Sequence, residues 1–225
     1  KAVAEAKTMK AIGGGEPHVA ATTRGEDKSY VRVARQEELK TTTGAAYLHV
    51  TSNETIHGVE YGLTAETAFP RGNGVPVVCD MSSDILGRQI DASQFDLIYA
   101  GAQKNIGPSG VTIVALKKEL TARGRKDIPT IFQYRTAAEN QSLYNTPPTF
   151  GIYLVRNTLT WLKNEIGGVA KIEERNKKKA QAIYGAIDGS GGFYKCPVEK
   201  ASRSIMNVVW RLPTPELEAA DLDRF

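Results

Sequence analysis

The chain has 225 residues, of which 41% are hydrophobic, and its 29 basic and 25 acidic side chains give a formal net charge of +4. This length can bury the core of one domain and part of another. The charge is too mild for a nucleic-acid-binding protein, which usually presents a clustered basic face, and no apolar run is long enough to span a bilayer. We therefore expect partners that are neither nucleic acid nor membrane.

The first 40 residues carry weak signals. Residues 1–7 have the composition of the middle of an alanine-rich helix and include no initiator methionine, so we expect the chain to be a piece of a longer protein. An organelle-targeting segment ahead of it therefore stays open. Residues 13–15 are three glycines but no phosphate-binding P-loop, because no Gly-Lys-Ser/Thr follows at the needed spacing. Residues 24–28 are predicted to form a hairpin tip between two short strands.

Apolar runs at residues 47–50, 75–79, 97–100 and 111–116 predict four strands. The segments between them are long enough for crossovers, which is typical of α/β layers. A helix predicted over residues 169–187 would then lead to a second domain that contains a strand-like run at residues 207–212. We expect a large domain over residues 1–168, followed by this helix and the start of a small domain over residues 169–225.

Asp80 ends the second predicted strand and is followed by Ser82 and Ser83. Open α/β sheets bind ligands at the carboxyl ends of their strands. A carboxylate there could hold the nitrogen of a pyridine ring protonated, as pyridoxal phosphate enzymes require. The other interpretation of such an aspartate is a turn former or helix cap.

Lys104 lies in a glycine-punctuated loop between the third and fourth predicted strands, with no acidic residue over residues 101–118. Small residues around it leave room for a large ligand. We expect this amine to be poorly solvated, which would lower its pKa and favour a nucleophilic, Schiff-base lysine. The alternative is a surface lysine in a turn, since lysine is almost never fully buried.

A helix is predicted to start near Thr146, which is a good N-cap, with Pro147 at the first helical position. Such a terminus presents free N–H groups and a partial positive charge, so it can bind phosphate, and Asn145 and Thr146 would add side-chain donors. An ordinary capped helix is the alternative interpretation. The cysteines Cys79 and Cys196 and the three histidines show no metal-ligand spacing, so we predict no metal and no disulfide.

Four of these segments together carry a family resemblance: Asn53-Glu-Thr55, Cys79-Asp-Met-Ser-Ser83, Gly101-Ala-Gln-Lys-Asn105 and Tyr144-Asn-Thr-Pro-Pro148. In content, order and spacing they resemble the phosphoserine aminotransferases, which are class V aminotransferases and pyridoxal phosphate enzymes of fold type I. The resemblance implies an aspartate-aminotransferase-like α/β fold. Its large domain would have three αβα layers around a mixed, mostly parallel sheet, and a smaller α/β domain would begin near the end of the chain.

The resemblance also implies roles for single residues. Lys104 would be the Schiff-base lysine and the proton-transfer base, and Asp80 would pair with the pyridine nitrogen of pyridoxal 5'-phosphate. Thr55 would hydrogen-bond the ring near its phenolic oxygen, and Gln103 would contact the phosphate.

Asn145 and Thr146 would reach the cofactor phosphate of the neighbouring subunit. The family's active site is accordingly expected to be shared across a homodimer. This assignment agrees with the predicted helix start, which would offer N–H groups at the same place.

The implied reaction moves an amino group between glutamate and 3-phosphohydroxypyruvate, giving O-phosphoserine and 2-oxoglutarate in cytoplasmic serine biosynthesis. The family's ring-stacking tryptophan would precede Lys1, and neither Trp161 nor Trp210 occupies that position. Substrate-binding arginine would follow Phe225. Two alternatives therefore stay open: another fold-type I pyridoxal phosphate enzyme, or a catalytically incomplete fragment that acts only as a dimerising or folding unit.

Overall fold

The computed structural model describes residues 2–222, and contacts divide the chain into two compact units. The sheet unit comprises His49–Thr51 and Pro76–Glu174. The terminal unit comprises Lys1–Leu48, Ser52–Val75 and Arg175–Phe225. Along the chain, the last boundary between the two units lies between Glu174 and Arg175, inside the helix Val169–Asp188. The units are not continuous segments of the chain, so the predicted domain boundary at residue 168 stays a prediction.

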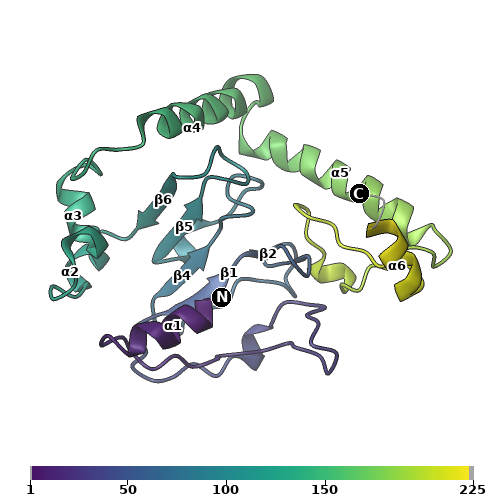
Figure 1. The fold of residues 1–225 in the computed structure, drawn as a ribbon, viewed down its shortest axis with the longest axis horizontal. Helices are drawn as coiled ribbons and strands as arrows, with labels where there is room; N and C mark the ends of the chain where they lie inside the picture. Colours follow the sequence, from purple (N-terminus) through teal and green to yellow (C-terminus); the bar gives the residue numbers. More distant parts are fainter. Residues whose placement is uncertain (1, 223–225) are drawn as a thin grey trace. The chain divides into compact units, whose positions relative to one another are not determined.

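Four strands form the sheet: β1 (Leu48–Thr51), β4 (Val77–Asp80), β5 (Leu97–Gly101) and β6 (Thr112–Leu116), in the order β1-β4-β5-β6 (Figure 1). β4 and β5 are parallel, whereas β5 and β6 are antiparallel. The four strands predicted from apolar runs are confirmed to within two residues. The sheet is mixed, as expected, and Asp80 is the last residue of β4.

The sheet strands are buried because their apolar side chains pack on the core side. Cys79 and Ala100 have no exposed surface, and Val77 is 4% exposed. A second cluster lies after β5, where Ala102 and Ile106 pack against Val155 of helix α4 (Thr149–Trp161). A side chain at Gly107 would come within 2.7 Å of Val155, so α4 can approach this loop only because the residue is glycine.

The predicted start of α4 is wrong by two residues. Pro148 is the N-cap and Thr149 the first helical residue, so Thr146 is not the cap and Pro147 is not in the helix. The cause is the second proline, because a residue that precedes proline is disfavoured from the α region. After α4 the chain continues through a π-helical turn, Leu162–Ile166, which ends at Gly167 in the left-handed conformation.

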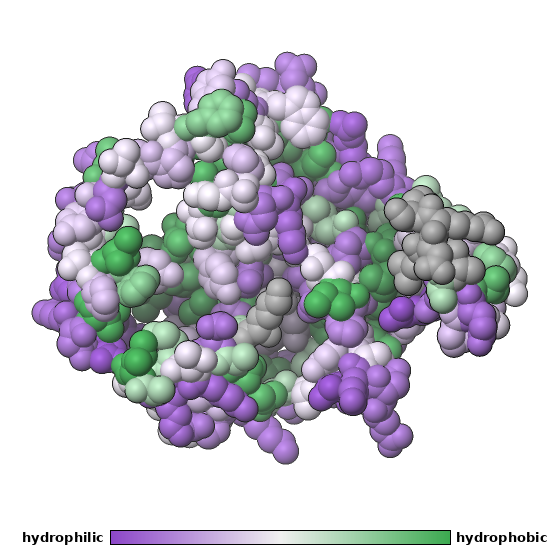
Figure 2. All heavy atoms as spheres, in the orientation of Figure 1, coloured by the Kyte–Doolittle hydropathy of each residue, from purple (hydrophilic) through white to green (hydrophobic). Residues whose placement is uncertain are grey.

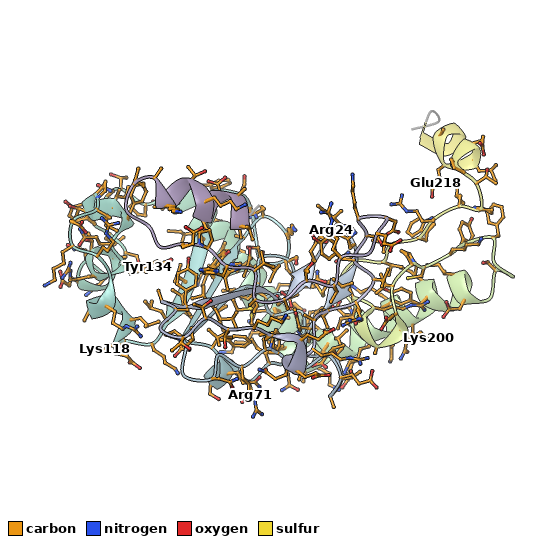
Figure 3. All side chains as sticks on the ribbon, turned by 90° about the horizontal axis from the view of Figure 1, so that it is seen from below. Arg24, Arg71, Lys118, Tyr134, Lys200 and Glu218 are labelled. Carbon is orange, nitrogen blue, oxygen red and sulfur yellow. The ribbon has the colours of Figure 1, made fainter. Side chains whose placement is uncertain are left out.

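Residues 117–148, here called the arm, connect β6 to α4 and contain little regular structure. Its elements are helix α2 (Leu120–Arg123), a 3-10 turn (Thr130–Phe132) and helix α3 (Tyr134–Glu139). In Figure 1 the arm runs from β6 through α2 and α3 to the start of α4, and Lys118 and Tyr134 mark it in Figure 3. None of these three elements contains a buried residue.

The terminal unit contains helices and two very short strands. The elements are α1 (Ala2–Lys10), β2 (Asn53–Glu54), β3 (Val59–Glu60), most of α5 (Val169–Asp188), α6 (Pro215–Leu222), and 3-10 turns at Gln36–Glu38 and Lys200–Ser202. The helices predicted near residues 1–7 and over 169–187 are confirmed. In the sheet unit a further 3-10 turn, Ala92–Gln94, precedes β5.

Two strand predictions in the terminal unit are wrong. Residues 207–212 make only an isolated bridge between Lys195 and Arg211, because the N–H of Asn207 is bonded to the side chain of Ser204 instead of a neighbouring strand. Around residues 24–28 a turn closes through Gly25 N–H and the Ser29 carbonyl, with one bridge from Arg24 to Tyr30 and no flanking strands. Within residues 2–222 no helix is long and apolar enough to cross a membrane.

Candidate active site

The site begins at Asp80, where β4 ends. Its side chain is partly buried, and its Oδ1 atom accepts a hydrogen bond of 2.9 Å from the backbone N–H of Ser82. The next N–H, that of Met81, donates to the Tyr99 carbonyl of β5 at 2.9 Å. The chain therefore turns away from the sheet directly after Asp80 and leaves this carboxylate at the carboxyl edge of the strands.

The loop after β4 is tied to the loop after β5. Gly101 N–H donates to Ser82 Oγ at 3.1 Å, and Asn105 Nδ2 donates to the Ile85 carbonyl at 2.6 Å. Because these bonds join the segments on either side of Lys104 to the segment that follows Asp80, the two predicted site residues lie on adjacent loops at one edge of the sheet.

Lys104 itself is exposed, so the expectation of a poorly solvated amine is wrong for the chain in this structure. The loop makes one helical turn, in which Ile106 N–H bonds to the Ala102 carbonyl. These two residues, four apart, point into the core, and Gln103 and Lys104 between them face the opposite side. The turn thus presents the amine outwards, where a ligand can reach it.

Gln103 folds back over the end of β5. A Cβ atom at Gly101 would lie 2.5 Å from its Oε1 atom, so the end of the Gln103 side chain lies directly over this glycine. The amide of Gln103 is therefore beside the backbone of the loop, and Gln103 is exposed like Lys104.

The other predicted cofactor contacts lie elsewhere. Asn145 and Thr146 are exposed at the end of the arm, two or more residues before the N-cap of α4. Thr55 belongs to the terminal unit, where its carbonyl accepts a hydrogen bond of 3.0 Å from Asn207 Nδ2. The structure brings Asp80, Gln103 and Lys104 to one sheet edge, and it leaves the roles of Thr55, Asn145 and Thr146 as predictions.

Two site residues were missed from the sequence, His49 of β1 and Tyr99 of β5. His49 Nε2 lies 2.9 Å from the Tyr99 hydroxyl, and Tyr99 is paired in register with Asp80 on the neighbouring strand. Burial lowers the pKa of His49, while the charge of Asp80 acts in the opposite direction. Burial, and then the Asp80 charge, raise the pKa of Tyr99. A polar tip inside each of two apolar strand runs was the available signal.

This arrangement fits a cofactor that needs a carboxylate beside a protonated ring nitrogen and an amine for covalent attachment. A carboxylate with fixed donors lies on one loop, and a primary amine lies on the loop next to it. Pyridoxal phosphate needs these two partners, a carboxylate at the pyridine nitrogen and a lysine for covalent attachment. Within residues 2–222, no group of three His, Cys, Asp or Glu side chains is placed to hold a metal ion.

Comparisons with known proteins agree with this chemistry. A family model described as Aminotransferase class-V matches residues 23–224. The phosphoserine aminotransferase of Herpetosiphon aurantiacus is 50% identical over 204 residues, which cover 91% of this chain and 54% of the relative. That of Niallia circulans is 49% identical over 97% of this chain and 57% of the relative. The chain thus spans about half the length of these curated relatives.

Solved structures show the same similarity. The phosphoserine aminotransferase from Bacillus circulans subsp. alkalophilus has a TM-score of 0.86 and 47% identity, covering 96% of this chain and 58% of that chain. A pyridoxal-phosphate-bound phosphoserine aminotransferase from Trichomonas vaginalis has a TM-score of 0.80 and 32% identity, covering 93% and 59%. The aspartate-aminotransferase-like α/β fold expected from the sequence is therefore confirmed.

Proposed function

Because the chain belongs to the class V aminotransferase family, we propose that it carries the pyridoxal phosphate site of a phosphoserine aminotransferase. The whole protein would transfer the amino group of glutamate to 3-phosphohydroxypyruvate, giving O-phosphoserine and 2-oxoglutarate. The observation that carries the proposal is the pair of adjacent loops that present Asp80 and Lys104 at one edge of the sheet. The cytoplasm stays the proposed location, on the family resemblance alone.

Asp80 and Lys104 would divide the work. The bound cofactor would supply an electron sink for the substrate's α-carbon. Asp80 would accept a hydrogen bond from the protonated ring nitrogen, and Ser82 N–H holds that carboxylate in place. Lys104 Nζ would hold the cofactor covalently and, once released, take up and return the proton of the substrate's α-carbon. Its outward position suits this task, because the amine must move between two partners.

Gln103 and Thr55 would complete the contacts made within one chain. The Gln103 amide, folded over Gly101, would donate to the cofactor phosphate. The Thr55 hydroxyl would hydrogen-bond the ring near its phenolic oxygen, and its backbone is fixed by Asn207.

Asn145 and Thr146 would serve a second copy of the chain. Both side chains are exposed, and the arm and the start of α4 around them expose large apolar side chains, including Ile131 (66%), Phe132 (70%) and Phe150 (72%). Figure 2 shows hydrophobic residues at the surface in this part of the molecule. Exposed apolar patches of this kind mark interaction sites. We therefore propose a homodimer in which Asn145 and Thr146 bind the cofactor phosphate of the partner.

Borohydride reduction after incubation with pyridoxal phosphate, followed by peptide mass mapping, tests the cofactor site. We expect stoichiometric label on Lys104 and none in Lys104→Ala. Lys118→Ala, which removes an exposed lysine of the arm, should keep the label on Lys104. Label spread over surface lysines would contradict the proposed site.

The substrate assignment needs the longer protein. Purified with its full length, it should convert glutamate and 3-phosphohydroxypyruvate to O-phosphoserine, and Lys104→Ala should abolish turnover. Labelling of Lys104 together with turnover of a different amino donor and acceptor pair would keep the cofactor site and contradict the substrates.

A further inference from the structure

Three polar side chains lie next to one another on three neighbouring strands of the sheet at Asp80. His49, Asp80 and Tyr99 lie on β1, β4 and β5, which are neighbours in that order. Asp80 is paired in register with Tyr99, and all three side chains are partly buried, whereas Val50, Cys79 and Ala100 beside them are buried. Since successive residues of a strand point to opposite faces, the three polar side chains share one face.

Tyr99 is the link between the other two groups. Its hydroxyl lies 2.9 Å from His49 Nε2, with the two rings tilted and their centroids 6.0 Å apart, and its register partner on the next strand is Asp80. A tyrosine hydroxyl has one hydrogen, and a carboxylate can only accept. Because a Tyr99 hydrogen directed at the neighbouring Asp80 carboxylate cannot also serve His49, His49 must then donate through its Nε2–H group.

The surroundings of Tyr99 keep it a donor. Burial and the nearby Asp80 charge both raise the pKa of the Tyr99 hydroxyl, and the neighbouring titratable groups Cys79 and Tyr134 act in the same direction. The hydroxyl is thus protonated throughout the physiological range. Ser82 N–H is one donor to the Asp80 carboxylate, and the Tyr99 hydroxyl, on the strand paired with Asp80, is placed to be a second.

We propose that Tyr99 and His49 are positioning residues, which orient the Asp80 carboxylate for the pyridine nitrogen of the cofactor through the chain His49 Nε2–H to Tyr99 O–H to Asp80. The inference deepens the proposed function and rests on it. Hydrogen bonds to a charged group are shorter and stronger than neutral ones, so they restrict rotation of the carboxylate more effectively. A preorganised site binds its ligand more tightly, because less conformational entropy is lost on binding.

A merely structural pair would behave differently. If the hydrogen bonds of Tyr99 only satisfied buried polar groups, loss of its hydroxyl would lower stability and leave the cofactor affinity of the folded protein unchanged. If it positions Asp80, the loss must act on the cofactor through Asp80, so the effects of changing the two residues must be coupled.

Equilibrium binding of pyridoxal phosphate to Tyr99→Phe, followed by the visible absorbance of the bound cofactor, separates these cases. We expect about tenfold weaker binding, the loss of one charge-assisted hydrogen bond, and a shifted absorbance. In an Asp80→Asn background the same change should alter affinity less than about twofold. His49→Gln should weaken binding by a smaller factor. Tyr153→Phe, which removes an exposed hydroxyl on α4, is the matched control.

A measurement without cofactor tests the proposed hydrogen bonds of Tyr99 themselves. The ultraviolet difference titration between the unchanged chain and Tyr99→Phe isolates one of its nine tyrosines. We expect Tyr99 to ionise at higher pH than a tyrosine free in water, and Asp80→Asn to bring that pH down. Far-ultraviolet circular dichroism and thermal unfolding of each variant establish that it is folded.

Three outcomes would overturn the inference. Ionisation of Tyr99 at the pH of a tyrosine free in water would exclude the hydrogen-bond chain. Tyr99→Phe and Tyr153→Phe could bind cofactor equally well, or the effect of Tyr99→Phe could simply add to that of Asp80→Asn, which would exclude positioning. A raised ionisation pH of Tyr99 together with no label on Lys104 would instead refute the proposed function, and with it the role of this pair.

Discussion

Two regions of the molecule with little regular structure are built in opposite ways. In the terminal unit, a polar junction of Asn53, Glu60, Ser204 and Asn207 joins distant segments through side-chain hydrogen bonds. Glu60 has no exposed surface and accepts from Ile205 N–H at 2.8 Å and from Ser204 Oγ at 3.1 Å. Asn53 Nδ2 donates to Asn207 Oδ1 at 2.8 Å. In the sheet unit, the arm instead exposes apolar side chains such as Phe132 and Tyr144.

The difference shows that irregular backbone has two physical meanings here. At the junction, buried polar side chains take the place of the hydrogen bonds between strands of a sheet. The backbone N–H groups there therefore find their partners within the same chain. The arm leaves many of its apolar side chains exposed. Exposed apolar patches are typical of surfaces that another molecule covers. In the proposed function the junction fixes the backbone near Thr55, whereas the arm brings Asn145 and Thr146 to a partner subunit.

The largest expected effect comes from breaking the junction. Glu60→Ala would leave the Ile205 N–H and the Ser204 hydroxyl without their acceptor in a buried place, which should lower the free energy of unfolding by about 3 kcal/mol. Urea unfolding followed by circular dichroism measures it. Glu60→Gln keeps one acceptor oxygen and should cost less.

Glu66→Ala is the matched control for this change, since Glu66 is exposed in the same unit. It should alter the free energy of unfolding by no more than about 0.5 kcal/mol. Equal losses in Glu60→Ala and Glu66→Ala would mean that the junction does not hold the terminal unit together.

The next effect concerns the arm. Phe132→Ser or Phe150→Ser should weaken self-association roughly tenfold, because each removes a large apolar side chain from the proposed dimer contact. Neither should change the free energy of unfolding of the monomer by more than about 0.5 kcal/mol, since both side chains are already exposed. Sedimentation equilibrium at several concentrations measures the association.

Phe193→Ser provides the comparison, because Phe193 is an exposed phenylalanine of the terminal unit. It should leave association unchanged. A chain that stays monomeric at all concentrations, or an arm substitution that unfolds the monomer, would contradict the view that the arm is an interface.

Sequence patterns predicted the parts of the site that depend on local order. The apolar runs located the strands, and Asp80 and Lys104 followed from their positions at strand ends. Exposure of Lys104 was predicted wrongly, because the helical spacing of Ala102 and Ile106 in a short loop decides which side the lysine faces. The start of α4 was also predicted wrongly, because two consecutive prolines move it to Thr149.

Contacts between distant segments could not be predicted. His49 and Tyr99 are 50 residues apart, and Glu60 and Ser204 are 144 apart. Neither pair has a periodic pattern, since each depends on which strands or turns become neighbours. The predicted strand at residues 207–212 also failed through side-chain contacts, because Glu60 binds the Ile205 N–H just before that segment and Ser204 binds the Asn207 N–H at its start.

The smallest expected effect lies in the terminal unit, where the partly buried Arg32 and Glu38 form two charged hydrogen bonds of 2.7 and 2.8 Å. The Arg32 hydrogen bonds, and then the Arg35 N–H, lower the pKa of Glu38 from 4.5 to about 2. A carboxyl whose pKa is lower in the folded state stabilises the fold above its unfolded pKa, and this stabilisation is lost as the pH falls through the folded value. It is therefore complete above about pH 4.5 and disappears towards pH 2.

Glu38→Gln should accordingly lower the free energy of unfolding by less than about 1 kcal/mol at pH 7, because solvent still reaches this partly buried pair and screens it. The difference from the unchanged chain should shrink between pH 4.5 and pH 2, as seen by urea unfolding at several pH values. Glu37→Gln, a change at an exposed neighbour, is the control and should alter the free energy of unfolding at pH 7 by no more than about 0.5 kcal/mol. A loss in Glu38→Gln as large as that in Glu60→Ala would mean that partly exposed ion pairs, as well as buried hydrogen bonds, hold the irregular segments of the terminal unit.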